Sequence, residues 1–174
     1  GFAENDSRKS QPVVRSEGNS LARFGANMAP VKHDHAGLTS PIFSYPYSRT
    51  REALYTLLRD GPLDPWHGVK LKYINPLTGG WPMPTLATFM QLLPHGFCGK
   101  PHRSTDGAVY SVVEGRGTAL IGGQAFDFGA RDTFVEPSWA TLSLSASAET
   151  VLFSYSDRPV QAALGLLREQ FLPA

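Results

Sequence analysis

The chain has 174 residues and a formal net charge of +1, with 41% hydrophobic and 18% charged residues. This length favours one domain with extra segments over two independent domains, and it is long enough to bury a sizeable core. Because the charge is nearly balanced and no apolar run reaches the roughly 18 to 20 residues that span a bilayer, we expect neither nucleic acid nor a membrane as a partner.

The chain has a single cysteine, Cys98, so it cannot form an internal disulfide framework. A lone thiol fits a reducing compartment, and the first residues, GFAENDSRKSQPVV, lack the apolar region of a secretory signal. We therefore predict a cytoplasmic protein. No second thiol or assembled base accompanies Cys98 in the sequence, which favours a loop thiol over a catalytic one.

Residues 1–40 are polar and are interrupted by prolines and glycines, with no sustained period of 2 or 3.6. We predict an extended arm or interdomain linker here, followed by a barrel with flanking helices over 41–174. The short piece at 20–24 is a candidate for docking on the barrel. His33 and His35 form a His-x-His pair, but they lack a flanking strand pattern, which favours a solvated loop over a metal site.

A short amphipathic helix is predicted after Ser48, with about three turns. Gly61 followed by Pro62 is typical of a helix end. The predicted apolar face comprises Ala53, Leu54, Leu57 and Leu58. We expect this helix to lie outside the barrel with its charged residues in water.

Strand patterns dominate the rest of the chain. Alternation at 69–74 places Val69, Leu71 and Tyr73 on one side of a strand, and the apolar run at 86–93 suits burial on both faces. Gly122 and Gly123 predict a hairpin turn. Further strands are predicted at 109–113, 118–121, 124–128, 133–135, 141–145 and 151–156. Many short strands at even spacing favour a closed or double-sheet antiparallel architecture.

The last segment of the chain changes to helical periodicity. Asp157 is a plausible N-cap and Pro159 falls in the first turn. Apolar residues then recur at helical spacing at Val160, Leu164, Leu167 and Phe171. We predict a C-terminal helix through this region that packs on the barrel or on another subunit.

The segment 96–117, GFCGKPHRSTDGAVYSVVEGRG, has the outline of a metal-binding β-barrel motif. It resembles the first motif of the cupins, in which a glycine, five residues, His-x-His, three or four residues, a glutamate, six residues and a glycine follow one another. His102 fills the first histidine, whereas Ser104 and Ala108 stand at the second histidine and the glutamate. In the segment that matches the second cupin motif, Leu142 stands at the last histidine.

A mononuclear iron or manganese site needs three or four converging lone-pair donors. Only His102 of the four positions supplies a good one, since a serine hydroxyl is a poor substitute for imidazole and the other two side chains donate nothing. We therefore expect no metal ion and no other cofactor in this chain.

Taken together, the segments resemble the bacterial gentisate 1,2-dioxygenases and the related salicylate and 1-hydroxy-2-naphthoate dioxygenases. The matching segments are RTREAL at 49–54, HGVKLKYINPLTGGWPMPT at 67–85, FMQLLPHGF at 89–97, RSTDGAVYSVVEGRG at 103–117, FVEPSW at 134–139 and LFSYSDRPVQAALGLLREQ at 152–170. The resemblance covers nearly all of residues 20–171.

This resemblance implies an all-β cupin-type double-stranded β-helix, or jelly roll, with a flanking N-terminal arm and helix and a C-terminal helix. Enzymes of the family look like bicupins, whose N-terminal barrel carries Fe(II) on three histidines and cleaves gentisate with O2 to maleylpyruvate, a step in the catabolism of aromatic compounds. The chain is similar to the C-terminal barrel. The resemblance therefore implies a non-catalytic role in assembly. The expected partner is an N-terminal cupin, and the expected assembly is a homo-oligomer.

Two alternatives stay open. In the first, the empty barrel is a binding module whose arginine and histidine hold a small aromatic carboxylate without catalysis. The candidate vestigial pocket comprises His102, Arg103, Ser104, Tyr110, Gln124, Trp139 and Leu142. In the second, a rearranged two-histidine, one-carboxylate metal site makes this chain an enzyme. Its candidate ligands are His102, His95 or His67, and Asp106 or Glu136.

Overall fold

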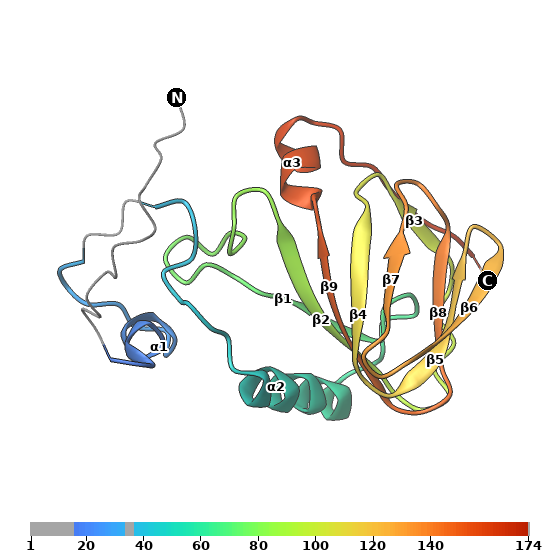
Figure 1. Cartoon of the computed structure of the whole chain (residues 1–174), viewed down its shortest axis with the longest axis horizontal. Helices are drawn as coiled ribbons and strands as arrows, with labels where there is room; N and C mark the ends of the chain where they lie inside the picture. The colour runs from blue at the N-terminus through green and yellow to red at the C-terminus, as the bar shows by residue number, and fades with distance from the viewer. Residues whose placement is uncertain (1–15, 34–36, 174) are drawn as a thin grey trace, which may run out of the picture.

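A computed structural model describes residues 16–33 and 37–173 as two antiparallel sheets with short helices around them (Figure 1). One sheet has the strand order β1-β2-β9-β4-β7 and the other β10-β3-β8-β5-β6. The helices are α1 (Asn19–Phe24), α2 (Tyr47–Asp60) and α3 (Arg158–Ala163). The strands are β1 (Val69–Lys72), β2 (Ala87–Leu93), β3 (His102–Ser104), β4 (Ala108–Glu114), β5 (Arg116–Ile121), β6 (Gln124–Gly129), β7 (Thr133–Glu136), β8 (Leu142–Ala146), β9 (Thr150–Ser156) and β10 (Glu169–Phe171).

The main core lies between the two sheets and follows from strict alternation along the strands. In β4, the buried side chains are Ala108, Tyr110 and Val112, and in β8 every second residue is likewise buried. Alternate residues of a strand point to opposite faces, so these positions meet across the sandwich. The apolar cluster that results comprises Leu93, Ala108, Tyr110, Val112, Ala119, Phe128, Leu142, Leu144, Ala146 and Leu152. The predicted double-sheet jelly roll is thus confirmed.

The final glycine of the motif at 96–117 is required by the packing of two chain segments. Gly115 has a φ of 87°, and a Cβ on it would lie 2.2 Å from the carbonyl oxygen of Glu149. Only a residue without a side chain permits both this backbone conformation and this close approach. The glycine therefore lets β4 turn into β5 tightly against the start of β9.

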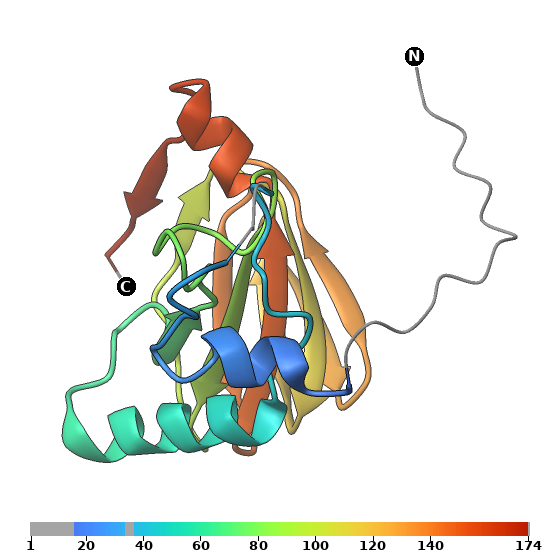
Figure 2. The same cartoon turned by 90° about the vertical axis from the view of Figure 1, so that its left-hand side faces the viewer.

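A second apolar cluster joins α2 to the outer face of the first sheet, at the end of the barrel opposite α3 (Figure 2). Leu54 of α2 is fully buried in this cluster, together with Val69, Met90, Leu92 and Val151. Tyr47 and Tyr55 pack at its rim. The predicted helix is thus confirmed, and it is one turn longer than expected, with 14 residues.

Two members of the predicted apolar face of α2 are in fact exposed, namely Ala53 and Leu57. The helix instead turns its two tyrosines towards the barrel. Their hydroxyls donate hydrogen bonds to acidic side chains, Tyr47 to Glu114 over 2.7 Å and Tyr55 to Glu149. A tyrosine can bury its ring while its hydroxyl stays hydrogen-bonded. The predicted apolar face counted only aliphatic residues and therefore left the tyrosines out.

The alternation predicted for 69–74 is confirmed, with a consequence for the barrel interior. Val69, Leu71 and Tyr73 all face the cluster beneath α2, on the outer side of the sheet. Lys70 lies between the first two and therefore points to the opposite face, into the barrel. The apolar side of β1 is covered by a helix, and its polar side lines the interior.

The predicted C-terminal helix is wrong beyond Ala163. The helix α3 has only six residues, and Gly165, with a φ of 69°, follows its end as expected of a helix-terminating glycine. The chain then extends into β10, which pairs with β3 so that Phe171 lies opposite His102. Leu164 and Phe171 are 67% and 48% exposed, so the helical repeat does not form a packed stripe.

Three other expectations concern the N-terminal region and the helices. Phe24 of α1 is buried, and Ser20 accepts a hydrogen bond from the backbone of Phe43, so this short helix packs on the segment that leads into α2. Residues 1–15 and His35, the second histidine of the His-x-His pair, lie outside the described residues. The boundary between arm and barrel at residue 40 stays a prediction. No helix within the described ranges is both long and apolar enough to cross a membrane.

Replacing the buried leucine of α2 should weaken the whole fold. We expect Leu54→Ala to lower the free energy of unfolding by about 2–5 kcal/mol, because it leaves a cavity between α2 and the sheet. The matched control is Leu57→Ala on the same helix, whose side chain is 45% exposed and whose change should stay within about 0.5 kcal/mol. Urea denaturation followed by circular dichroism measures both. Equal effects of the two variants would contradict the assigned packing.

Candidate functional site

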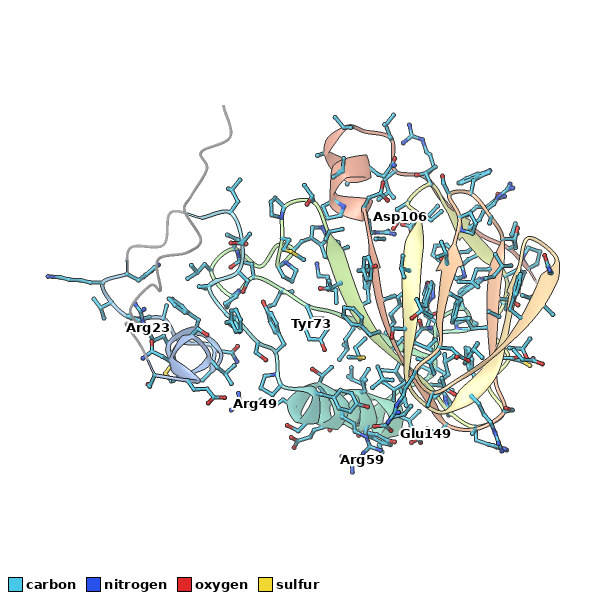
Figure 3. All side chains as sticks on the ribbon, viewed as in Figure 1. Arg23, Arg49, Arg59, Tyr73, Asp106 and Glu149 are labelled. Atoms are coloured by element: carbon cyan, nitrogen blue, oxygen red, sulfur yellow. The ribbon has the colours of Figure 1, made fainter. Side chains whose placement is uncertain are left out.

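The candidate site is a cavity of about 310 Å³ in the barrel interior, at the end that α3 covers. Asp106, one of its lining residues, lies under α3 in Figure 3, whereas Glu149 lies at the opposite end beside α2. The cavity is lined by His67, Lys70, Lys72, Phe89, His102, Ser104, Asp106, Ala108, Tyr110, Glu136, Ser154, Ser156, Arg158 and Glu169. It therefore gathers charged and polar groups in a place that the two sheets shield from water.

Two histidines form one wall of this cavity. The rings of His67 and His102 meet edge to face with centroids 4.6 Å apart, and Phe171 of β10 stacks on His102. Burial lowers the pKa of His67 to about 2 and that of His102 to about 4, with the charge of Lys70 adding to both shifts. Both imidazoles are therefore neutral at pH 7. His102 is only 8% exposed, and its Nδ1 has no hydrogen-bond partner.

A second group of side chains links α3 and β10 to the barrel. Arg158, at the start of α3, forms ion pairs with Glu169 and, over 3.5 Å, with the buried Asp106. Asp106 also accepts a hydrogen bond from the Ser104 hydroxyl. The guanidinium of Arg158 thus pairs with two carboxylates of the same chain, which compensate its positive charge.

A third group faces the cavity from β1, β4 and β7. The hydroxyl of the buried Tyr110 donates a hydrogen bond of 3.2 Å to Glu136 Oε2, while Glu136 Oε1 has no partner. Glu136 is 4% exposed, and burial raises its pKa to about 7 although the charge of Lys70 opposes the shift. Burial also lowers the pKa of Lys70. The ammonium lies 4.9 Å from the ring centroid of Phe89 and 5.9 Å from that of Tyr110.

The four positions that correspond to cupin metal ligands do not fit a metal ion. His102 and Ser104 line the cavity, but the serine hydroxyl is engaged with Asp106, and Ala108 has no donor atom. Leu142, directly opposite His102 in the β3–β8 pairing, is fully buried in the apolar core. One imidazole among these four side chains cannot supply the three donors that iron needs.

The alternative of a rearranged metal site receives no support from the geometry. In the described part of the chain, no three histidine, cysteine, aspartate or glutamate side chains are grouped so that they could hold a metal ion. His67 lies beside His102, but His95 is exposed in the loop that follows β2. Asp106 is already paired with Arg158.

Of the predicted pocket residues, His102, Ser104 and Tyr110 line the cavity. Arg103 does not, because its guanidinium lies 4.6 Å from the ring centroid of Trp139 and donates hydrogen bonds to Gln170 on the outside of the barrel. Trp139 is correspondingly on the surface. The expected clamp of arginine and histidine is therefore not assembled around one cavity.

The remaining predicted residues lie elsewhere in the fold. Gln124 begins β6 and is exposed, next to an apolar surface groove rather than the barrel cavity. Leu142 belongs to the core between the sheets. Cys98 is exposed in the loop between β2 and β3 and forms no disulfide, as expected of a loop thiol.

Four charged cavity residues were missed by the sequence reasoning, namely Lys70, Lys72, Arg158 and Glu169. A signal for Lys70 existed, because strict alternation with Val69 and Leu71 forces it to the other face. That signal needed the knowledge that α2 covers the apolar face. Nothing in the sequence marks Arg158 and Glu169 as partners, since the predicted long helix would have separated them from β3.

The chain is similar in sequence to several 1,2-dioxygenases, although no family model matches it. It is 51% identical over 168 residues to gentisate 1,2-dioxygenase 1 of Aquipseudomonas alcaligenes, which covers 97% of this chain and 48% of that protein. It is 37% identical over 132 residues to 5-aminosalicylate 1,2-dioxygenase of a Comamonas species, covering 75% of this chain and 35% of that protein.

The fold is likewise similar to solved structures. The crystal structure of salicylate 1,2-dioxygenase from Pseudoaminobacter salicylatoxidans with gentisate superposes with a TM-score of 0.83 at 29% identity, over 90% of this chain and 44% of that one. The chain thus spans about half the length of the relatives that it matches. The resemblance to the cupin dioxygenases that the sequence motifs predict is confirmed.

The unusual pKa of Glu136 can be measured directly. We expect its side-chain carboxyl carbon to titrate near pH 7 in a carbon-13 NMR experiment, instead of near the ordinary value of 4.5. Because the pKa in the folded state is raised, the stability linked to Glu136 is complete below pH 4.5 and is lost as the pH rises through about 7. Neighbouring charges that act on the carboxyl are Lys70, which lowers its pKa, and Asp106, which raises it.

Lys70→Met should therefore move the midpoint further up, whereas Lys72→Met should leave it in place. A midpoint near 4.5 in the unmodified chain would contradict the burial of Glu136 in the cavity.

Proposed function

This chain belongs to the family of gentisate 1,2-dioxygenases as a half-length homologue, and we propose that it forms the metal-free, non-catalytic C-terminal cupin half of such an enzyme. In this proposal the chain contributes stability and subunit assembly. The parent reaction is the Fe(II)- and O2-dependent cleavage of gentisate to maleylpyruvate, and an N-terminal cupin outside this sequence carries the iron. A cytoplasmic location and a homo-oligomeric state remain predictions that accompany this role.

The observation that carries the proposal is the set of side chains at the former ligand positions. Ser104, Ala108 and Leu142 stand where a cupin needs a histidine, a glutamate and a second histidine. Leu142 packs in the apolar core and is not available to the cavity. A single imidazole among the four former ligand positions gives Fe(II) no stable set of ligands there.

The lysine in the cavity supports the same proposal electrostatically. Lys70 lines the same cavity as His102, and its positive charge adds to the lowering of the His102 pKa. Two cations in a poorly solvated cavity repel each other strongly. The charge of Lys70 therefore disfavours a divalent ion beside His102.

An apolar surface at the edges of both sheets supports the assembly role. Leu120, Phe126 and Val135 are each more than 40% exposed on β5, β6 and β7. Beside them lies a groove of about 510 Å³, whose lining includes Phe134 and Pro137. Edge strands with exposed apolar residues are natural docking sites. Since the relatives are about twice as long as this chain, we assign this surface to the N-terminal cupin half.

Metal content and turnover test the catalytic part of the proposal. After anaerobic incubation with Fe(II) and desalting, the 174-residue chain should retain far less than one iron per chain and should not cleave gentisate. The control is the full-length Aquipseudomonas relative treated in the same way. A His102→Ala variant should behave like the unmodified chain. Stoichiometric iron with turnover, lost in His102→Ala, would overturn the proposal.

Assembly is tested by co-expression with the part of the Aquipseudomonas relative that the match does not cover. We expect the two halves to co-purify, and Phe126→Glu or Val135→Glu to reduce recovery of the complex by about tenfold or more, because a charge would be desolvated in the interface. Leu57→Glu, on the exposed side of α2, is the matched control. Co-purification that all three variants leave unchanged would exclude this surface.

A further inference from the structure

The side chain of Lys70 places an amine inside the barrel. It lines the cavity of about 310 Å³ and keeps part of its surface accessible there. Within residues 16–33 and 37–173 it forms no ion pair, and its nitrogen lies near the rings of Phe89 and Tyr110 instead. Burial is the main cause that lowers its pKa. At a given pH, a larger share of Lys70 than of an exposed lysine is therefore the neutral amine, which is the nucleophilic form.

A carboxyl group that can transfer a proton faces the same cavity. Glu136 is 4% exposed, its Oε2 accepts the hydrogen bond from Tyr110, and its Oε1 has no partner. Burial raises the pKa of Glu136 to about 7, so near neutral pH both the carboxylic acid and the carboxylate are populated. Glu136 and Lys70 act on each other electrostatically across the cavity. The cavity thus combines a nucleophile with a group that can donate and accept a proton.

The charges around the cavity favour an uncharged ligand. Arg158 is held by Asp106 and Glu169. Lys72 is exposed at the rim. Apart from Lys70 itself, the described lining residues therefore leave no cation inside the cavity to pair with an anionic ligand. The volume of the cavity is at the lower end of the range for small-molecule sites, which suits a short molecule.

We propose that Lys70 is a covalent binding site for small uncharged aldehydes, which it holds as an imine inside the barrel. The site goes beyond the assembly role. It needs no metal ion and no turnover, so either role can hold without the other.

The reaction is a condensation that needs no oxidant or reductant. The lone pair of the Lys70 amine forms a bond to the carbonyl carbon, and a proton moves from the nitrogen to the oxygen, which gives a carbinolamine. Glu136 in its acid form then donates a proton to the hydroxyl, which leaves as water while the nitrogen lone pair forms the C=N bond. The products are one protonated imine, one water and the Glu136 carboxylate. The positive charge of the imine and the negative charge of Glu136 then face the same cavity.

Reductive trapping tests the site. The 174-residue chain is incubated near neutral pH with a low concentration of butanal and with cyanoborohydride, which reduces an imine to a stable butylamine, and peptide mass mapping then locates the butyl groups. The other lysines of the chain serve as references in the same sample, namely Lys9, Lys32, Lys72 and Lys100. We expect Lys70 to be butylated about tenfold or more faster than each of them, because burial lowers its pKa. Labelling of Lys70 at the rate of the references would overturn the proposal.

Glyoxylate, an aldehyde that carries a carboxylate, tests the class of ligand. The ratio of Lys70 labelling to Lys32 labelling removes the intrinsic reactivity of each probe, because Lys32 is exposed. We expect this ratio to be smaller for glyoxylate than for butanal. A larger ratio for glyoxylate would refute an uncharged ligand.

Variants test the cavity and the role of Glu136. Ala108→Leu keeps every charge but fills the cavity, so it should slow the labelling of Lys70 to that of the exposed lysines. Glu136→Gln should also slow it. If Glu136 acted only through its charge, its removal would lower the pKa of Lys70 further and labelling would become faster. The matched control is Glu149→Gln at the opposite end of the barrel, which should leave the rate unchanged (Figure 3).

Circular dichroism confirms that each variant is folded. Fast labelling of Lys70 in a folded Ala108→Leu chain would show that the cavity is not the binding site. Faster labelling in Glu136→Gln would refute its role as proton donor. If Ala108→Leu does not fold, the comparison of Glu136→Gln with Glu149→Gln decides.

Discussion

The packing of α2 on the outer face of β1 and β2 is the interaction on which the character of the barrel interior depends. The helix covers the apolar side of β1, where Leu54 packs against apolar side chains of the sheet. Side chains alternate along a strand, so the other side of β1 must then face the interior, and Lys70 stands there. A helix outside the barrel thus determines that a cation lies inside it.

That cation changes what the interior can hold. In a cupin with its ligands intact, the centre of the barrel accommodates a metal ion, and its histidines and carboxylate supply lone pairs. Here the ammonium of Lys70 contributes the positive charge, and burial keeps His67 and His102 neutral beside it. The nearby carboxylates divide their roles, since Asp106 and Glu169 hold Arg158 while Glu136 keeps an unpaired oxygen. The side chains of the cavity are thus arranged for ion pairing and hydrogen bonding.

The fold was more predictable from the sequence than the site. Alternation along the strands and the Gly122–Gly123 turn depend on local rules, so the double sheet and its strands could be predicted. The C-terminal helix failed because apolar spacing at Leu164 and Leu167 resembles a helix, whereas pairing of β10 with β3 is a long-range interaction. Arg103 was expected in the pocket because it adjoins His102, but adjacent residues of a strand point to opposite faces. The assignment of Ser104, Ala108 and Leu142 to the ligand positions of a cupin needed only the spacing of the motif. The pairing of Leu142 opposite His102 agrees with that alignment.

Stability alone does not explain why this interior is polar. Replacing buried charged groups with apolar side chains of similar volume is often neutral or stabilising, because the desolvation of each charge costs several kcal/mol, roughly as much as the pairing returns. An interior that served only the fold could be filled like the core around Leu142 and Leu144. Instead it keeps an open volume between an unpaired ammonium and a half-paired carboxylate, and it surrounds both with aromatic rings. Such an arrangement stores unsatisfied polar interactions at one place, and a complementary molecule gains free energy by completing them.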